Sequence, residues 1–318
     1  MIQFIIRRLI QSVLVIVLVS VVVFLIMRLL PGDPLTLFIA QNELTNLSEN
    51  DMNTLREEFG LNKPLIEQYF GWTGDLFRGD LGKSIFKYVS VSTLLKERLP
   101  ITIHLGILAL IISVFFGITA GTICAVRRGG RIDTIVTSIA NFGMSVPIFW
   151  LGVLMVYIFS LYLKWLPVQG YVSPFDDFWL STKSLIMPVF CLSVVSLAGI
   201  TRQTRSSMLE IVRQDYIRTA WSKGLRERVI VFRHILKNGL IPIMTLIGLQ
   251  VSHILGGAVL IETVFNIPGM GRLIVESVTN HDYPVIQGGI VLCAIAVALV
   301  NLLVDISYGW IDPRIRYG

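Results

Sequence analysis

The sequence has few charged residues and few cysteines. Only 15% of its 318 residues are charged, whereas soluble globular proteins average about 25%. Its three cysteines all fall inside apolar stretches and show no metal-ligand spacing, so neither a disulfide framework nor a structural metal site is expected. The composition disfavours a soluble enzyme and excludes a disordered chain or a small disulfide-bonded scaffold.

The sequence also lacks the common motifs of nucleotide, dinucleotide and zinc binding. Gly82-Lys83-Ser84 invites comparison with a phosphate-binding loop, but that loop requires a glycine where Phe77 stands. The four histidines, at positions 104, 234, 253 and 281, lie in different segments and suggest no Ser/His/Asp arrangement. We therefore expect no catalytic residue, no metal and no cofactor in this chain.

What the sequence does contain is long apolar runs. Hydrophobic residues make up 54% of the chain, the mean hydropathy is +0.72, and a helix needs about 20 apolar residues to cross a bilayer. The first run lacks a small-residue cleavage site and is too long for a signal peptide, so it should remain as a membrane anchor. Pro147 should kink the third run, and Pro188 lies in the short fourth one. We predict an all-α integral membrane protein with six transmembrane helices, at residues 9–30, 101–126, 135–163, 185–201, 240–261 and 284–308.

The distribution of lysine and arginine predicts the orientation of these spans. With the N-terminus inside, the short cytoplasmic segments carry 16 basic residues and the short segments on the opposite side carry 3. Both termini are therefore expected in the cytoplasm. The net charge of +6 is explained by this bias, and no basic stripe with interleaved aromatic residues suggests a nucleic-acid partner.

This topology places residues 31–100 outside the cytoplasm as an insert between the first two spans. Ser48 and Asp51 form a capping-box-like start for a helix that could end at Gly60, and Pro64 suits the first turn of a second helix. The turn-forming sequence 79–84 is expected to dock the insert on the membrane face.

The segment 202–239 lies between the fourth and fifth spans, on the cytoplasmic side. Its apolar residues recur at helical spacing opposite a charged face, and Gly224 can end this amphipathic helix in a left-handed turn. A helix resting on the lipid surface and a helix presented to a cytoplasmic partner fit this pattern equally well. The apolar face comprises Val212, Tyr216, Ile217, Ala220, Trp221, Gly224 and Leu225.

Few polar residues lie within the spans. Asn141, Ser145, Gln250 and His253 fall near mid-depth, and Glu262 lies near a span end. Hydrogen bonding between helices is the favoured interpretation for such groups, and lining of a translocation path is the alternative. A carboxylate at mid-depth, which an ion-coupled carrier or channel would use, is absent, so a stand-alone carrier is a weaker hypothesis. Uphill transport would require another subunit to supply the energy.

Several motifs together resemble the membrane permease subunits of ATP-binding-cassette (ABC) importers of the peptide/nickel class, over nearly the whole chain. They are Arg7-Arg8, residues 30–34 (LPGDP), 60–64 (GLNKP), 79–84 (GDLGKS), 215–220 (DYIRTA) with 223–225 (KGL), Glu262, Phe265, 268–269 (PG), 271–272 (GR), 282–287 (DYPVIQ) and 312–314 (DPR). The general signature of these importers begins Glu-Ala-Ala, whereas this chain has Arg218-Thr219-Ala220.

The resemblance implies a complex in a prokaryotic cytoplasmic membrane. A second homologous permease, two ATPase subunits and an extracytoplasmic solute-binding protein would be the partners, with ATP and magnesium bound by the ATPases rather than by this chain. Residues 1–30 would form the first span, 31–100 the insert and 101–318 a five-helix core with the coupling loop 202–239. The residues assigned to ATPase coupling are Asp215, Tyr216, Arg218, Ala220, Trp221 and Gly224.

The resemblance also implies a choice of substrates. Import of short peptides is favoured over nickel, because His253 is isolated and the nine methionines are scattered, which does not suggest a metal path. A metal chelate or an oligosaccharide is a further alternative. Residues assigned to the translocation path are Asn141, Ser145, Gln250, His253 and Glu262.

Overall fold

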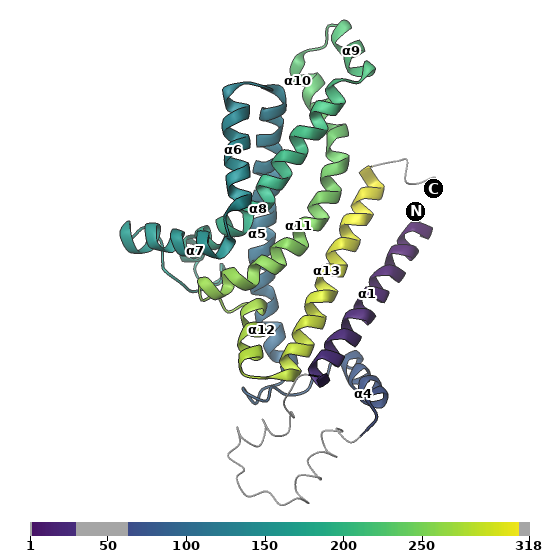
Figure 1. Cartoon of the computed structure of the whole chain (residues 1–318), viewed down its shortest axis with the longest axis vertical. Coiled ribbons are helices and arrows are strands. Elements are labelled where there is room, and N and C mark those ends of the chain that lie inside the picture. The colour runs from purple at the N-terminus through teal and green to yellow at the C-terminus, as the bar shows by residue number, and fades with distance from the viewer. Residues whose placement is uncertain (1, 30–62, 312–318) are drawn as a thin grey trace, which may run out of the picture.

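The computed structural model describes residues 2–29 and 63–311, and within these ranges the regular structure is helical apart from one isolated bridge between Lys83 and Ser90. The predicted helix from Ser48 to Gly60 and the motifs at 30–34 and 312–314 lie outside the described residues. Figure 1 shows the long helices running side by side, with short helices gathered at both ends.

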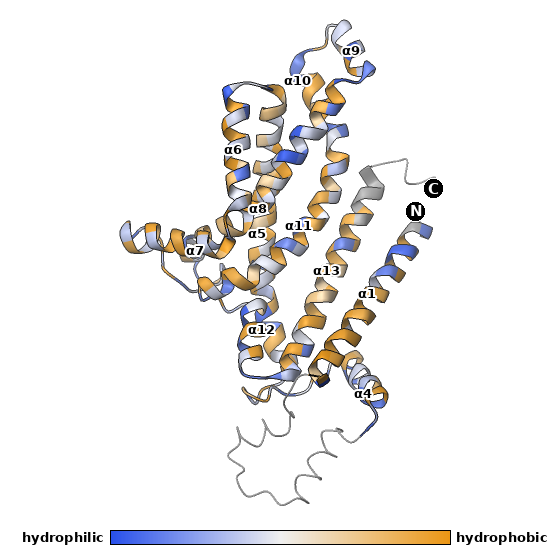
Figure 2. Ribbon diagram, in the orientation of Figure 1, coloured by the Kyte–Doolittle hydropathy of each residue, from blue (hydrophilic) through white to orange (hydrophobic). Residues whose placement is uncertain are grey.

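Among residues 2–29 and 63–311, five helices are long and apolar enough to cross a membrane. Many of their large apolar side chains are exposed, as expected for a surface that faces lipid. Figure 2 shows that hydrophobic residues predominate along these helices. These helices confirm five of the six predicted apolar spans as helical segments. They are α1 (Ile2–Leu29), α5 (Val91–Val126), α8 (Phe178–Val212), α11 (Lys237–Val264) and α13 (Tyr283–Ile311).

The third predicted span is not one kinked helix. It consists of α6 (Arg131–Ser145), followed by α7 (Ile148–Met155) and the π-helix η1 (Val156–Tyr162), and the two parts are bent by 102°. Pro147 lacks an N–H group and forces the preceding Val146 into an extended conformation, which ends α6. The structure therefore has six spans only if α6 and α7–η1 form one broken span.

The helices also extend beyond the apolar runs. The helix α8 includes residues 202–212, which the sequence assigned to the cytoplasmic loop, and α5 begins within the predicted insert. Pro188 and Pro100 lie inside these two helices. Apolar length therefore underestimates helix length, because polar residues continue the helix outside the bilayer.

The centre of the bundle is formed by α5, α8 and α11. Buried side chains from all three pack into one apolar cluster that includes Leu105, Met187 and Ile254. The helices α5 and α8 approach closely at Gly121, where an added Cβ would lie 2.5 Å from the Thr204 Cβ. Glycine is thus required at this crossing because no side chain fits there.

At one edge of the bundle α1 lies beside α13 and contacts the amphipathic helix α4 (Leu65–Phe77) (Figure 1). The buried Phe24 ring meets Tyr69 edge-on at 5.5 Å, and the Ser20 and Tyr69 hydroxyls are 2.8 Å apart. The helices α4 and α12 (Met270–Thr279) mark one end of the molecule. The opposite end, which we call the α9 end, carries α9 (Asp215–Ser222), α10 (Glu227–Val229) and the π-helix η2 (Ile230–Leu236).

Candidate functional site

The predicted coupling segment folds as the short helix α9. It is preceded by Gln214 in an extended conformation and followed by Gly224, whose φ of +71° is the left-handed conformation that glycine adopts without strain. The predicted helix end at Gly224 is therefore confirmed. The chain then passes through α10 and η2 directly into α11, so that α9 is joined to a long helix at each side.

The inner face of α9 packs against the rest of the chain. Ile217 is fully buried and Ala220 is 8% exposed, in a cluster with Met208 of α8 and Ile230 and Ile235 of η2. This cluster attaches α9 to the ends of α8 and α11. Because protein interiors are closely packed, α9 cannot shift without displacing side chains of this cluster.

The outer face of α9 is accessible. The side chain of Asp215 is 97% exposed and that of Arg218 is 73% exposed, and the two are paired at 3.6 Å. Tyr216 and Trp221 are exposed as well, and Asn238 donates a hydrogen bond to the Tyr216 hydroxyl at 3.2 Å. Ala220, which the sequence assigns to the apolar face and to ATPase coupling, is buried within the chain, because helical spacing places it beside Ile217. Tyr216 and Trp221 are the apolar groups that α9 presents outward.

An ion pair that sequence reasoning missed lies towards the same end of the molecule. Arg205 of α8 donates two hydrogen bonds to the buried Asp133 carboxylate, with N–O distances of 2.6 and 2.8 Å. The Gly129 N–H donates a third, at 2.9 Å. This pair attaches α6 to α8 beside the turn that joins α5 and α6. Gly129 and Gly130, just before Asp133, are a local signal for a turn at this point in the sequence. The partner Arg205 could not be found in this way, because it lies 72 residues further along the chain.

The residues assigned to a translocation path do not form one lining. Gln250 is buried and accepts a hydrogen bond from Ser196 of α8 at 2.8 Å. This bond joins two helices, as the sequence interpretation favoured for polar residues within the spans. Asn141, Ser145 and His253 are exposed on the chain. Within residues 2–29 and 63–311, the one hydrogen bond between members of this set joins the Ser145 hydroxyl to the Asn141 carbonyl.

Glu262 is fully buried at the α12 end of the bundle. Its carboxylate accepts hydrogen bonds from the Thr102 hydroxyl, at 2.5 Å, and from the Arg272 N–H, at 2.9 Å. Thr102 in turn accepts from the Met270 N–H. A Cβ at Gly269 would lie 2.2 Å from this carboxylate, so the chain closes directly over it. The motif residues Glu262, Gly269 and Arg272 are thus brought together because the carboxylate holds the first turn of α12.

The turn at residues 79–84, which the sequence assigns to docking of the insert, leads into a contact with the turn between α12 and α13. Gly79 and Gly82 have positive φ angles, and Asp80 accepts a hydrogen bond from the Gly82 N–H at 2.9 Å. Ser84 then donates to the buried Asp282 carboxylate in the turn between α12 and α13, and the Ile85 N–H donates to the same group at 3.1 Å. Two motifs from distant parts of the chain therefore form one junction.

Comparisons with known proteins agree with this architecture. The family described as "binding-protein-dependent transport system inner membrane component" matches residues 117–317, and its N-terminal counterpart matches residues 1–106. A probable peptide ABC transporter permease protein of Sinorhizobium fredii is 43% identical over 314 residues, which cover 99% of each chain. The oligopeptide transport system permease protein AppB of Bacillus subtilis is 38% identical over 320 residues, which cover 100% of each chain.

A solved structure shares the fold. An inward-facing structure of the MetNI methionine ABC transporter aligns with a TM-score of 0.58 at 18% identity, covering 69% of this chain and 96% of that one.

Proposed function

Because this chain belongs to the family of binding-protein-dependent transport system inner membrane components, and is a multi-pass permease subunit of an ABC importer, we propose that it helps to import short peptides. We assign peptides as the substrate class because the chain aligns end to end with several relatives named as peptide, oligopeptide or dipeptide permeases.

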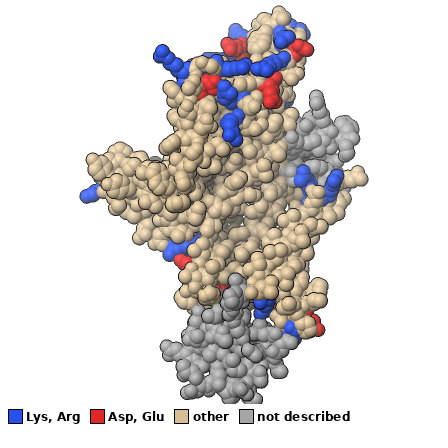
Figure 3. Space-filling model, viewed as in Figure 1, with Lys and Arg blue, Asp and Glu red and all other residues tan. Residues whose placement is uncertain are grey.

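We propose that the α9 end of the molecule faces the cytoplasm. Lysine and arginine side chains gather at this end in Figure 3, including those beside the α5–α6 turn, as the positive-inside rule expects of cytoplasmic loops. The N-terminal end of α1 and the C-terminal end of α13 also point to this side in Figure 1. Both termini would then be cytoplasmic, and α4, α12 and the insert would lie on the outer side.

The proposed partners are a second homologous permease, two ATPase subunits that bind ATP and magnesium, and an extracytoplasmic solute-binding protein. The outer face of α9, with Asp215, Tyr216, Arg218 and Trp221, would dock in a groove of an ATPase subunit. Closure of the ATPases around ATP would move α9, and the cluster around Ile217 would pass this movement to α8 and α11. Asn141, Ser145 and His253, which are exposed on this chain, would face the path at the interface with the second permease.

Two experiments test the proposal. A Trp221→Cys variant of the complete complex should form a crosslink to an ATPase subunit with a short thiol-reactive reagent, whereas a Phe77→Cys variant, at the other end, should not. Uptake of labelled di- to hexapeptides should depend on the complex and on ATP, and uptake of radioactive nickel should not. Nickel uptake without peptide uptake would overturn the substrate assignment while leaving the role as a permease intact.

A further inference from the structure

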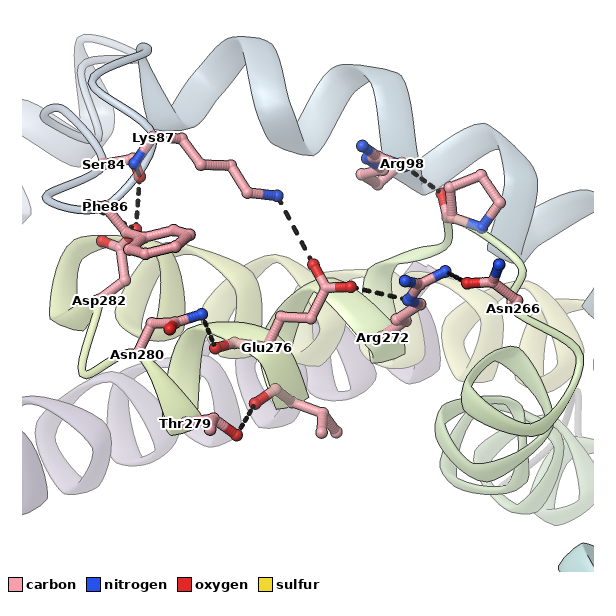
Figure 4. Close-up of polar contacts among 12 residues, drawn as sticks. Ser84, Phe86, Lys87, Arg98, Asn266, Arg272, Glu276, Thr279, Asn280 and Asp282 are labelled. Atoms are coloured by element: carbon pink, nitrogen blue, oxygen red, sulfur yellow. Dashed lines mark hydrogen bonds and ion pairs between the residues drawn. The ribbon is translucent and has the colours of Figure 1, made fainter. Parts of the chain in front are cut away.

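A polar pocket opens at the α12 end, between α5, the loop that precedes α12, and α12 itself (Figure 4). Its volume is about 330 Å³. Two arginines from different helices, Arg98 of α5 and Arg272 of α12, line it together with Glu276. The remaining lining residues are Pro268, Gly269 and Leu273.

Both arginines retain unused hydrogen-bond donors. A guanidinium group has five N–H donors. Arg98 donates one of them to the Pro268 carbonyl at 3.2 Å, has no carboxylate partner among residues 2–29 and 63–311, and keeps a buried Nε without any partner. Arg272 donates to Glu276 at 2.7 Å and to the Asn266 side chain. The two side chains thus approach one pocket with donors to spare.

Charged side chains of both signs lie in and beside the pocket. Lys87 lies 3.6 Å from the second oxygen of Glu276, and Arg272 donates to the first, so this carboxylate already has two cationic partners. The two other nearby carboxylates, Glu262 and Asp282, are 0% and 2% exposed and already accept hydrogen bonds from the chain. An anion that enters the pocket therefore meets guanidinium N–H donors, because Arg98 has no carboxylate partner among residues 2–29 and 63–311.

We propose that this pocket binds the C-terminal carboxylate of a short peptide as the peptide enters the translocation path. This inference rests on the proposed peptide function and on the outward orientation of α12. A carboxylate can accept charge-assisted hydrogen bonds from the N–H groups that remain on the two guanidinium groups. Every linear peptide carries this group whatever its sequence, so such a site would recognise the substrate class without selecting side chains.

The test uses the complete complex in nanodiscs of phosphatidylcholine. The probe is Ala-Ala-benzoylphenylalanine, a photoreactive tripeptide, supplied as the free acid and as the C-terminal amide. We expect the acid to label this chain about tenfold more than the amide, because a charge-assisted hydrogen bond contributes enough free energy for such a ratio. Arg98→Gln and Arg272→Gln should reduce labelling by the acid to the level of the amide, and Arg98→Lys should have an intermediate effect. Arg78→Gln, at the exposed residue that follows α4, is the matched control and should change nothing.

Each other outcome contradicts the inference in a distinct way. Transport of both peptide forms with equal labelling would overturn the site alone. Transport of neither form by the unmodified complex would overturn the proposed peptide function and this role with it. Loss of labelling when phosphatidylglycerol is added, together with loss of bound phosphatidylglycerol in Arg98→Gln, would assign the pocket to a lipid phosphate. The thermal midpoint of each variant separates a binding defect from a folding defect.

Discussion

The Ser84 hydroxyl donates a hydrogen bond to the buried Asp282 carboxylate, which joins two residues 198 positions apart in the chain. The same carboxylate accepts from the backbone N–H groups of Ile85 and Phe86, so it satisfies three donors of one turn. The insert is thereby attached to the turn that connects α12 and α13. A movement of either element must displace the other or break this junction.

Replacement of Asp282 should therefore loosen the junction. Asp282→Ala leaves the buried Ser84 hydroxyl without its acceptor, which costs about 1–3 kcal/mol, and also removes the acceptor of two partly buried N–H groups. We expect faster hydrogen exchange at the amides of Ile85 and Phe86 and a lower thermal midpoint of the purified complex. Asp75→Ala, at an exposed ion pair of α4, is the control. Unchanged exchange at both amides in Asp282→Ala would show that the junction does not hold the turn.

The Asp133–Arg205 pair predicts a coupled effect on stability. Loss of one partner leaves the other partly buried and unpaired, which for buried pairs costs about 3–5 kcal/mol. Asp133→Asn and Arg205→Gln should each lower the free energy of unfolding, and the double variant should lose less than the sum of the two. Chemical unfolding of the purified chain in detergent measures all three. Simple additivity would contradict the pairing, and Asp215→Asn, at an exposed pair, should change stability by less than about 0.5 kcal/mol.

Gly271 should not tolerate a side chain. A Cβ there would lie 2.5 Å from the Cα of Val259, and a backbone atom of α11 cannot move aside without shifting the helix. Gly271→Ala should destabilise the chain by about 1–3 kcal/mol and lower its amount in the membrane. Gly256→Ala is the control, because no atom lies within 4 Å of its added Cβ. Equal amounts of the two variants, measured by immunoblot of membranes, would show that α11 and α12 do not meet this closely.

The two faces of α9 predict two separable defects. Trp221→Ala removes an exposed aromatic group, so it should reduce substrate-stimulated ATP hydrolysis by the complex and leave the stability of this chain within about 0.5 kcal/mol. Ile217→Ala empties a fully buried position and should lower the free energy of unfolding by about 2–5 kcal/mol. ATPase assays and thermal unfolding on the same preparations check both results. Normal stimulation in Trp221→Ala would contradict docking through this face.

The long apolar runs were sufficient to predict a multi-pass helical protein. The distribution of lysine and arginine is the basis for the orientation that we propose. Gly224 also predicted the end of α9 correctly, because a left-handed glycine is a local signal. The break at Pro147 was predicted only as a kink. A proline shows that the helix is disturbed, but packing of the flanking segments decides the angle, which is 102° here.

The sequence by itself determined which segments are apolar enough to enter a membrane and where α9 ends, since hydropathy and turn preferences act within a few neighbouring residues. Only the tertiary structure decided that Ala220 faces inward, that Glu262 holds the start of α12, and that Asp133 pairs with Arg205. These outcomes depend on contacts between segments that are distant in the chain. Their free energies arise from burial and hydrogen bonding that exist only once the helices have packed.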